Sequence, residues 1–345
     1  MTIAIALSGG ADSLLSLALL KEQGCRLIGL HAFFIPPTDS DHLKVHALEE
    51  QCRSMDIPFR VIDLSDAFET RIIHPFIRAY IQGKTPNPCA WCNRDMKFGL
   101  LMDTACAQGA RTIATGHYVR VLQTPQGPGL FRGLDASKDQ SYFLSLVSPE
   151  AWQQTVFPLG TWRKADVLAA LAARNLCPAE ANESQEICFI PDDYRTFLTK
   201  RGVVLPGPGP VTTRQGKRLG THQGLWRYTQ GQRKGLGIAY EHPLYVLSKD
   251  QNTNTLIVGS QDEVWAAGCH ASQVNIMVPQ KFWPEDLLVQ TRYRQQAGAA
   301  RVTLADKTLQ IHFITPQEVP TPGQIVTVYA PSGQVLAGAV ITQAL

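Results

Sequence analysis

The chain has 345 residues, of which 44% are hydrophobic, and a formal net charge of +3. This length allows two or three domains, and the composition is that of an ordinary globular protein. No run approaches the roughly 18 apolar residues that a membrane span needs, and no basic signal-peptide region precedes the first apolar residues. We therefore expect a cytoplasmic protein without membrane contact. Its eight cysteines should be core residues, metal ligands or nucleophiles rather than a disulfide framework.

A short apolar strand, Ile3 to Leu7, is followed by a glycine-rich turn and an apolar helical stretch, Leu14 to Leu20. The turn reads Ser8-Gly9-Gly10-Ala11-Asp12-Ser13. Glycines let backbone amides face a bound anion, serine hydroxyls add donors, and the helix directs its positive end at the ligand. Unlike a Walker loop, it contains no Lys. With an Asp that can serve Mg²⁺, it predicts an ATP-binding loop; the alternative is an ordinary tight turn.

Beyond this turn, the first 195 residues alternate between strand-like and helical patterns. The expected strands are Arg26 to Phe34, Phe59 to Leu64 and Thr112 to Thr115, and the expected helices are Asp41 to Met55, Asp66 to Gln82 and Asn93 to Gln108. This alternation predicts an α/β fold, a doubly wound parallel sheet with helices on both faces. Ligands of such sheets bind at the carboxyl ends of the strands, where the glycine-rich turn lies.

A Pro- and Gly-rich run, Leu205 to Pro210, marks a domain boundary. Helical periodicity is scarce after it, and from about Ala267 short β segments separated by Pro and Gly predict a small barrel. We therefore expect a catalytic domain over residues 1–200, a small central domain over 201–262 and a C-terminal β-barrel over 263–345.

Charge is unevenly distributed: residues 1–195 carry 18 Lys and Arg against 21 Asp and Glu, whereas residues 196–345 carry 14 against 8. Between Thr196 and Tyr240, eight basic residues occur without an acidic one, interleaved with Trp226 and Tyr228. This composition suits a nucleic acid, with phosphates on the cations and bases on the aromatic rings. The alternative is a solvated basic face.

Cys89 and Cys92 form a Cys-x-x-Cys pair at the first turn of the third expected helix. A helix N-terminus lowers a thiol pKa, so the pair is a candidate for thiolates in a redox, zinc or iron–sulfur site. Cys188 is a third candidate, because a polar run turns apolar at this residue. The remaining cysteines are expected to be small core side chains: Cys25, Cys52, Cys106, Cys177 and Cys269.

Seven blocks across nearly the whole chain resemble, in order, the motifs of the MnmA/TrmU family of tRNA 2-thiouridylases. They are Ser8 to Ser13; Gly83 to Pro88 with Cys92-Asn93 and Lys97-Phe98; Ala114 to Tyr118; Lys138 to Phe143; Ile187 to Ile190; Gly231 to Gly237; and Thr291 to Gln295. The resemblance implies a PP-loop ATPase domain, a small central domain and a C-terminal β-barrel. The implied reaction is ATP-dependent replacement of oxygen by sulfur at carbon 2 of the wobble uridine in Lys, Glu and Gln tRNAs.

The resemblance also implies residue roles. ATP, with Mg²⁺ at its phosphates, would bind to Ala6, Leu7, Ser8, Gly9, Gly10, Ala11, Asp12, Ser13, Ala32 and Gly116. The target base would contact Asn87, Pro88 and Cys89, and the rest of the tRNA would contact Lys138, Asp139, Gln140, Arg233, Lys234, Arg292 and Tyr293. Cys92 and Cys188 match the first and second catalytic cysteines, and Asp12 would serve the ATP step. We expect His117 to pack or to hydrogen-bond, with catalysis as the alternative.

This chain has Cys89 where the family motif has Asp. We therefore expect Cys89, Cys92 and Cys188 to hold a 4Fe–4S cluster whose open iron binds sulfide. The alternative is a persulfide on Cys188, supplied by a relay protein and released by a disulfide with Cys92. An interpretation of another class is an RNA-binding module with structural zinc on these thiols. A further alternative is another adenylating enzyme of the same superfamily as the MnmA/TrmU enzymes, such as an amidotransferase or ligase, that shares only the loop. Because one chain carries every motif, it can act as a monomer.

Overall fold

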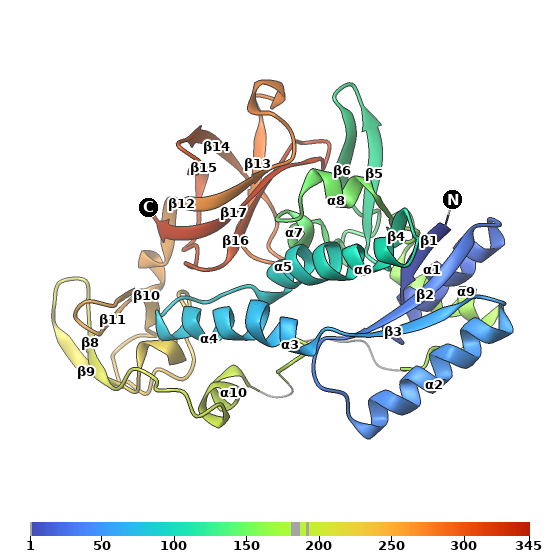
Figure 1. The fold of residues 1–345 in the computed structure, drawn as a ribbon. Coiled ribbons are helices and arrows are strands. Elements are labelled where there is room, and N and C mark those ends of the chain that lie inside the picture. The colour runs from blue at the N-terminus through green and yellow to red at the C-terminus, as the bar shows by residue number, and fades with distance from the viewer. Residues whose placement is uncertain (1, 181–186, 191–192) are drawn as a thin grey trace.

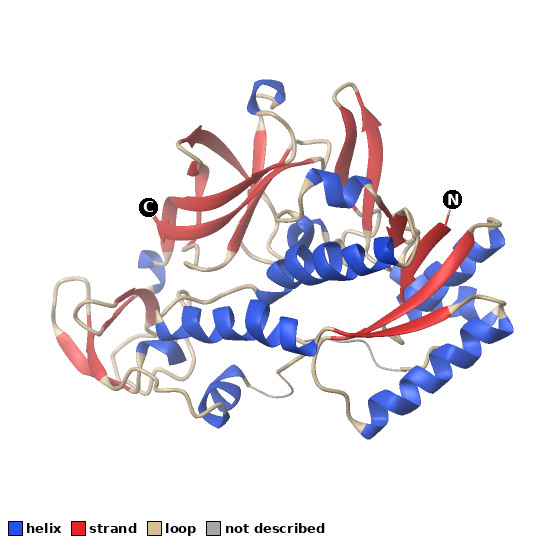
Figure 2. Ribbon diagram, in the orientation of Figure 1, coloured by secondary structure: helices blue, strands red, loops and turns tan. Residues whose placement is uncertain are grey.

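The computed structural model describes residues 2–180, 187–190 and 193–345, and it contains a parallel-sheet domain, a small β domain and a closed barrel (Figure 1). Helices are concentrated in the amino-terminal part, whereas the carboxyl-terminal part consists mainly of strands (Figure 2). Within the described residues, no helix is long and apolar enough to cross a bilayer.

The amino-terminal sheet has the strand order β3-β2-β1-β4-β7, with every neighbouring pair parallel. Its strands are β1 Thr2–Ala6, β2 Arg26–Phe33, β3 Phe59–Asp63, β4 Thr112–Ala114 and β7 Thr155–Val156. Strand order reverses at β1, which lies between β2 and β4. A ligand crevice is expected outside the carboxyl ends of β1 and β4, because the connections leave in opposite directions there.

Helices cover both faces of this sheet, so the predicted doubly wound α/β fold is confirmed. Ile5 packs with apolar residues of α1 Ala11–Glu22, α2 Asp39–Ser54 and α9 Lys164–Ala172. The adjacent Ala4 faces the opposite side, against α6 Leu101–Ala107. The alternation follows from the two-residue period of a strand, which turns successive side chains to opposite faces.

Two of the predicted helices are composite. The pattern over residues 66–82 forms α3 Ser65–Phe68, a π-helical segment η1 Glu69–Ile73 and α4 His74–Ile81. The pattern over residues 93–108 begins earlier, at α5 Pro88–Cys92, and continues through a second π-helical segment, η2 Asn93–Leu100, into α6. It begins early because the side chain of Asn87 caps the helix and Pro88 suits its first position.

Several short elements were not predicted. They are the hairpin of β5 Val119–Thr124 and β6 Gly127–Arg132, and the helices α7 Ser141–Leu144, α8 Pro149–Gln153 and α10 Tyr194–Lys200. Among the cysteines expected in the core, Cys52 and Cys269 are buried, but the prediction is wrong for Cys106 and Cys177, which are exposed. Cys106 lies in the last turn of α6, and Cys177 follows α9 on the surface.

The two β domains follow the Pro- and Gly-rich run. The central sheet has the order β10-β11-β8-β9 and contains β8 Gly209–Thr212, β9 Arg218–His222, β10 Tyr245–Asp250 and β11 Thr255–Gly259, with η3 Leu225–Arg227 beside it. The barrel closes in the order β12-β15-β14-β13-β16-β17. Its strands and short helices are η4 Gln261–Glu263, β12 Trp265–Ile276, η5 Gln280–Phe282, β13 Leu287–Gln290, β14 Gly298–Ala305, β15 Thr308–Glu318, β16 Ile325–Tyr329 and β17 Val335–Ala344. Alternating buried residues of β15 fill the interior, so the predicted barrel is confirmed.

Candidate active site

The glycine-rich turn joins β1 to α1 at the reversal of strand order. The Ser13 hydroxyl accepts a hydrogen bond from the Ser8 amide at 3.2 Å and donates to the Gly10 carbonyl at 2.9 Å. Gly9 has a φ of +96°, and a Cβ atom there would lie 2.9 Å from the Lys44 side chain. Only glycine adopts this positive φ without strain and leaves room for the Lys44 side chain. The sequence thus forms a tight loop in which the Lys44 side chain packs on Gly9, whereas Gly10 remains partly exposed.

The Asp12 carboxylate is held by two residues that sequence reasoning missed. Lys164, at the start of α9, places Nζ 2.8 Å from both carboxylate oxygens, and the Tyr118 hydroxyl donates to Oδ1 at 2.7 Å. Gly116 packs on the same turn, since a Cβ atom there would lie 3.0 Å from the backbone carbon of Asp12. Lys164 is 152 positions away from Asp12, so no local pattern could have identified it. The loop itself contains no lysine, but Lys164 of α9 places its positive charge on the loop residue Asp12.

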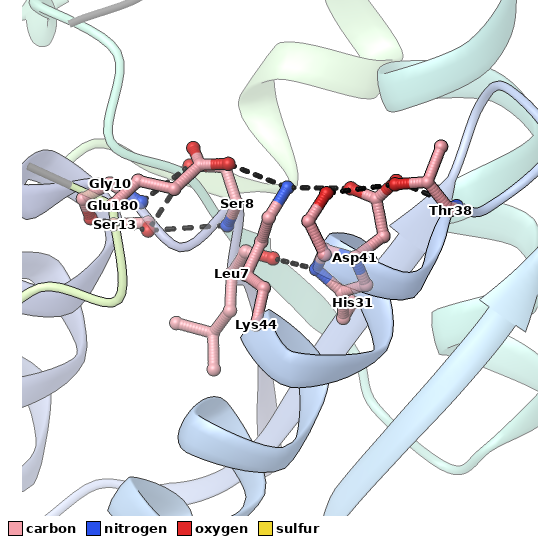
Figure 3. A network of polar contacts seen from close by, with 10 residues as sticks. Leu7, Ser8, Gly10, Ser13, His31, Thr38, Asp41, Lys44 and Glu180 are labelled. Carbon is pink, nitrogen blue, oxygen red and sulfur yellow. Dashed lines mark hydrogen bonds and ion pairs between the residues drawn. The ribbon is translucent and has the colours of Figure 1, made fainter. Parts of the chain in front are cut away.

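A second polar network borders the loop (Figure 3). Lys44 of α2 places Nζ 3.0 Å from Asp41 Oδ1 and 2.6 Å from Glu180 Oε1. The Glu180 amide donates to the Gly9 carbonyl at 3.0 Å, and His31 Nδ1 donates to the Leu7 carbonyl at 2.7 Å. These contacts fix the chain at Glu180 directly against the loop. Ala32, which follows His31 in β2, lies at the neighbouring strand end.

Cys89 and Cys92 occupy the first turn of α5, as predicted. The Asn87 side chain is buried and accepts a hydrogen bond from the Ala90 amide at 3.1 Å, which caps this turn. The predicted lowering of the thiol pKa values is wrong. Burial raises the pKa of Cys89 to about 11 and that of Cys92 to about 12, although the positive charge of Lys97 lowers both. Loss of hydration disfavours a thiolate more than this short helix favours it.

Cys188 is placed by its neighbour in the sequence. Phe189 is buried and packs edge-on against Phe76 at 5.2 Å and Phe68 at 5.6 Å between ring centroids. Cys188 is exposed as a whole residue, but the protein atoms around its sulfur withdraw it from water and raise its pKa, while Lys97 lowers it. Negative charge on Cys188 raises the pKa of both Cys89 and Cys92, so the Cys188 sulfur lies near enough to both thiols for their charges to interact.

The segment Thr115 to Tyr118 lies between the loop and η2, the helical segment that continues the Cys89–Cys92 helix. His117 is buried, its Nδ1 lies 2.9 Å from the Thr115 hydroxyl, and its ring packs against Phe98 at 5.7 Å. Burial lowers the pKa of His117 well below its ordinary value, and Lys97 adds to this effect. A neutral, packed His117 agrees with the expected structural role. The residues on either side of it, Gly116 and Tyr118, contact Asp12.

The arrangement of Cys89, Cys92 and Cys188 decides which metal group they could hold. Across residues 2–180, 187–190 and 193–345, no three His, Cys, Asp or Glu side chains are gathered closely enough to hold a single metal ion. A structural zinc on Cys89, Cys92 and Cys188 therefore finds no support in this part of the chain. A four-iron cluster poses a different demand, because each thiolate binds a separate iron and the ligands stand further apart. Cysteine thiolates are the donors that such a cluster uses, and the charge of Lys97 favours the thiolate form of all three cysteines.

Two residues expected to contact tRNA use their side chains within the protein. The Asp139 carboxylate is 7% exposed, pairs with Arg132 at 2.8 Å and accepts from the Gly133 amide at 3.0 Å. The Arg292 guanidinium donates to the carbonyls of Gln230 and Val319, both at 3.1 Å, and so ties the central domain to the barrel. Both side chains therefore position other parts of the chain.

The remaining residues expected at tRNA differ in exposure. Arg233 and Lys234 are exposed, Lys138 is half-buried, and Gln140 accepts a hydrogen bond from the Tyr118 amide at 2.9 Å. The Tyr293 ring packs at 4.3 Å from that of Phe143. Trp226 and Tyr228 are each only 5% exposed, which overturns their expected role as stacking surfaces in the basic segment.

Together the fold and the loop define a HUP-type nucleotide-binding domain followed by two β domains. Family models match the chain over residues 1–192 ("tRNA methyl transferase HUP domain"), 195–260 ("tRNA methyl transferase PRC-barrel domain") and 266–341 ("Aminomethyltransferase beta-barrel domain"). The chain is 52% identical over 347 residues to the tRNA-specific 2-thiouridylase MnmA of Nitratidesulfovibrio vulgaris strain Miyazaki F, with 99% of each chain covered. It is 50% identical over 352 residues to that of Oleidesulfovibrio alaskensis, again with 99% of each covered. The chain belongs to the MnmA family of tRNA-specific 2-thiouridylases.

A solved 4-thiouridine synthetase–RNA complex with bound ATP is a more distant match. It is 16% identical to this chain, with a TM-score of 0.36, and the match covers 55% of this chain and 44% of the other.

Proposed function

We propose that this chain is an ATP-dependent tRNA sulfurtransferase that converts the wobble uridine of Lys, Glu and Gln tRNAs to 2-thiouridine. One observation carries the proposal: the segment Thr115 to Tyr118 contacts the glycine-rich loop through Gly116 and Tyr118, and its His117 ring packs against Phe98 of η2, the helical segment that continues the Cys89–Cys92 helix. A two-step reaction needs this adjacency. The carbon-2 oxygen is first adenylated with release of pyrophosphate, and sulfur then displaces AMP from the same carbon.

The loop residues fit ATP phosphates. Gly10 leaves room for a phosphate to approach the backbone, and the hydroxyls of Ser8 and Ser13, 3.3 Å apart on the same loop, would add donors. Asp12 is the candidate ligand for the Mg²⁺ that accompanies ATP, and it shares its carboxylate with Lys164. The Lys164 ammonium sets the orientation of this carboxylate and adds positive charge where pyrophosphate must leave.

The target base reaches the site beside α5. Asn87, Pro88 and Cys89 form the start of this helix, and the capping bond from Asn87 to Ala90 orders them. A base must leave its stack before its carbon 2 can be attacked, so a rigid receiving surface lowers the cost of ordering it. The exposed Arg233 and Lys234, together with the half-buried Lys138, are the proposed contacts to the rest of the tRNA.

We assign a 4Fe–4S cluster to Cys89, Cys92 and Cys188 as the sulfur-carrying group. When bound by three thiolates, such a cluster leaves one iron free to take up sulfide. The chain contributes the three sulfurs, the charge of Lys97 that favours their thiolate forms, and the Phe189 anchor that places Cys188. The competing route uses a persulfide on Cys188, a disulfide with Cys92 and a reducing dithiol that restores both thiols.

A thiolation assay tests the function. Unmodified tRNA, MgATP and sulfide are incubated with anaerobically purified protein, and 2-thiouridine, pyrophosphate and AMP are measured. Cys92→Ser and Cys188→Ser should abolish 2-thiouridine while ATP binding persists, whereas Cys106→Ser, an exposed control, should not change it. Asp12→Ala should weaken the ATP step. A fully active Cys188→Ser protein would refute the role of that thiol. If 2-thiouridine forms with a persulfide donor protein but not with sulfide, the reaction follows the persulfide route and the cluster proposal is wrong.

A further inference from the structure

A small cationic cavity lies beside the thiol helix. It has a volume of about 180 Å³ and is bordered by η1, α4, the connection from α4 to α5, and strands of the barrel. Three cations line it, Arg71, Arg78 and Lys84, and no Asp or Glu does. All three side chains are exposed, and none forms an ion pair with a carboxylate among the described residues. Three unneutralised positive charges on one narrow cavity favour an anionic ligand.

The cavity borders the helix that carries Cys89 and Cys92. Pro88, the first residue of α5, lines it, and so does Trp91, which lies between Cys89 and Cys92 in the chain. The Arg94 guanidinium lies 4.2 Å from the centre of the Trp91 ring and supports it. A ligand in the cavity is therefore adjacent to the residues that would receive the target base.

The rim is held in place by all three domains. The Thr85 amide donates to the Pro322 carbonyl at 2.9 Å, and the Gln324 side chain donates to the Thr85 carbonyl at 2.9 Å. Gly83 has a φ of +63° and packs directly against the Gln251 side chain of the central domain. The cavity is thus formed before a ligand arrives, which reduces the ordering cost of binding.

We propose that this cavity holds a backbone phosphate of the single-stranded anticodon loop, next to the nucleotide that is modified. The inference rests on the proposed function, because it takes tRNA as the substrate. Cations combined with an aromatic ring suit single-stranded RNA. An acidic protein would instead need a flatter surface, of about 800 Å² per partner in a stable complex. The small volume of the cavity and its positive charge therefore both favour an RNA phosphate over an acidic protein.

The test uses the double variant Arg71→Gln/Arg78→Gln in the full-length protein. Its control is Arg301→Gln, which removes an exposed arginine of β14 that lies outside the cavity. Binding of unmodified tRNA is measured by fluorescence anisotropy over a salt series, together with the KM for tRNA in thiolation. Each lost contact to a single-stranded phosphate should reduce the slope of log K against log salt by about 0.7. The KM for tRNA should rise about tenfold or more in the double variant, and the control should match the wild type.

The outcomes separate this inference from the proposed function. Wild-type protein that cannot thiolate tRNA refutes the function, whatever the variants do. If the wild type thiolates tRNA and the double variant keeps its salt slope and KM, only the phosphate site is overturned. If the double variant keeps the salt dependence of tRNA binding but has a raised KM for a protein sulfur donor, the cavity is a protein-docking site and the proposal is also overturned. Thermal unfolding of both variants establishes that they are folded.

Discussion

Replacing Lys164 with Gln should impair the ATP step while leaving the fold intact. The ammonium lies 2.8 Å from both oxygens of Asp12, and the two side chains are 16% and 33% exposed. A partly exposed ion pair contributes at most about 1 kcal/mol to the free energy of unfolding, so the variant should fold. A hydrogen bond to a charged group contributes about 1.5–3 kcal/mol, and we expect this range for the pair once ATP covers it. The kcat/KM for ATP should therefore fall by about 10- to 150-fold.

The assay is pyrophosphate release with saturating tRNA, with Lys21→Gln as a control on the exposed end of α1. The partner variant is Asp12→Asn. If Lys164 acts by orienting Asp12, the double variant Asp12→Asn/Lys164→Gln should be no slower than the slower single variant. A Lys164→Gln protein within twofold of wild type would refute the assigned role. Strictly additive losses would show that the two side chains act independently.

Three further perturbations follow from the same geometry. Burial lowers the pKa of His117, so below about pH 6.5 the unfolded chain binds a proton that the folded chain does not. The free energy of unfolding should therefore drop by up to about 1.4 kcal/mol per pH unit on acidification, and urea titrations of His117→Gln should show a weaker dependence. Gly83→Ala should lower the free energy of unfolding more than Gly109→Ala, as measured by calorimetry. Both glycines have a positive φ, which costs a residue with a Cβ atom about 1–2 kcal/mol, but only at Gly83 would the added Cβ atom also meet the Gln251 side chain. Cys89→Asp should lose the iron and acid-labile sulfide of anaerobically purified protein, whereas an iron-free, active wild type would exclude the cluster.

The parts of the site that the sequence predicts are those encoded by neighbouring residues. Ser8 to Ser13 follow a strand and open a helix, so the loop is visible from spacing alone. Lys164 and Tyr118 reach Asp12 only because α9 and the β4 end pack near α1, and no short-range pattern records such packing. The hairpin of β5 and β6 is a different case, because Pro125, Gln126 and Gly127 carry a turn signal that could have been used.

Burial also explains the error over the basic segment. Its composition suggested aromatic rings for stacking, but Trp226 donates its Nε1 hydrogen to the Pro206 carbonyl at 3.1 Å and packs in the core. Tyr228 lies in the core of the central domain. A cation and an aromatic residue that are adjacent in sequence can face different environments, because the chain turns between them. The charges near Trp91 are exposed around a cavity and therefore form the more specific nucleic-acid feature.

The thiols show how magnitudes decide between two opposing effects. A helix N-terminus stabilises an anion by about 0.3–1 kcal/mol, whereas a rise in the pKa of Cys92 from 9.0 to about 12 corresponds to about 4 kcal/mol. Burial therefore dominates, and an isolated Cys92 would remain a thiol at neutral pH. Reactivity must come from a partner that stabilises the thiolate inside the protein, such as Lys97, whose charge acts on all three cysteines. The proposed cluster would add irons that replace the thiol protons. A site that is inert until such a partner binds is protected from adventitious oxidation, because the thiolate is the reactive form.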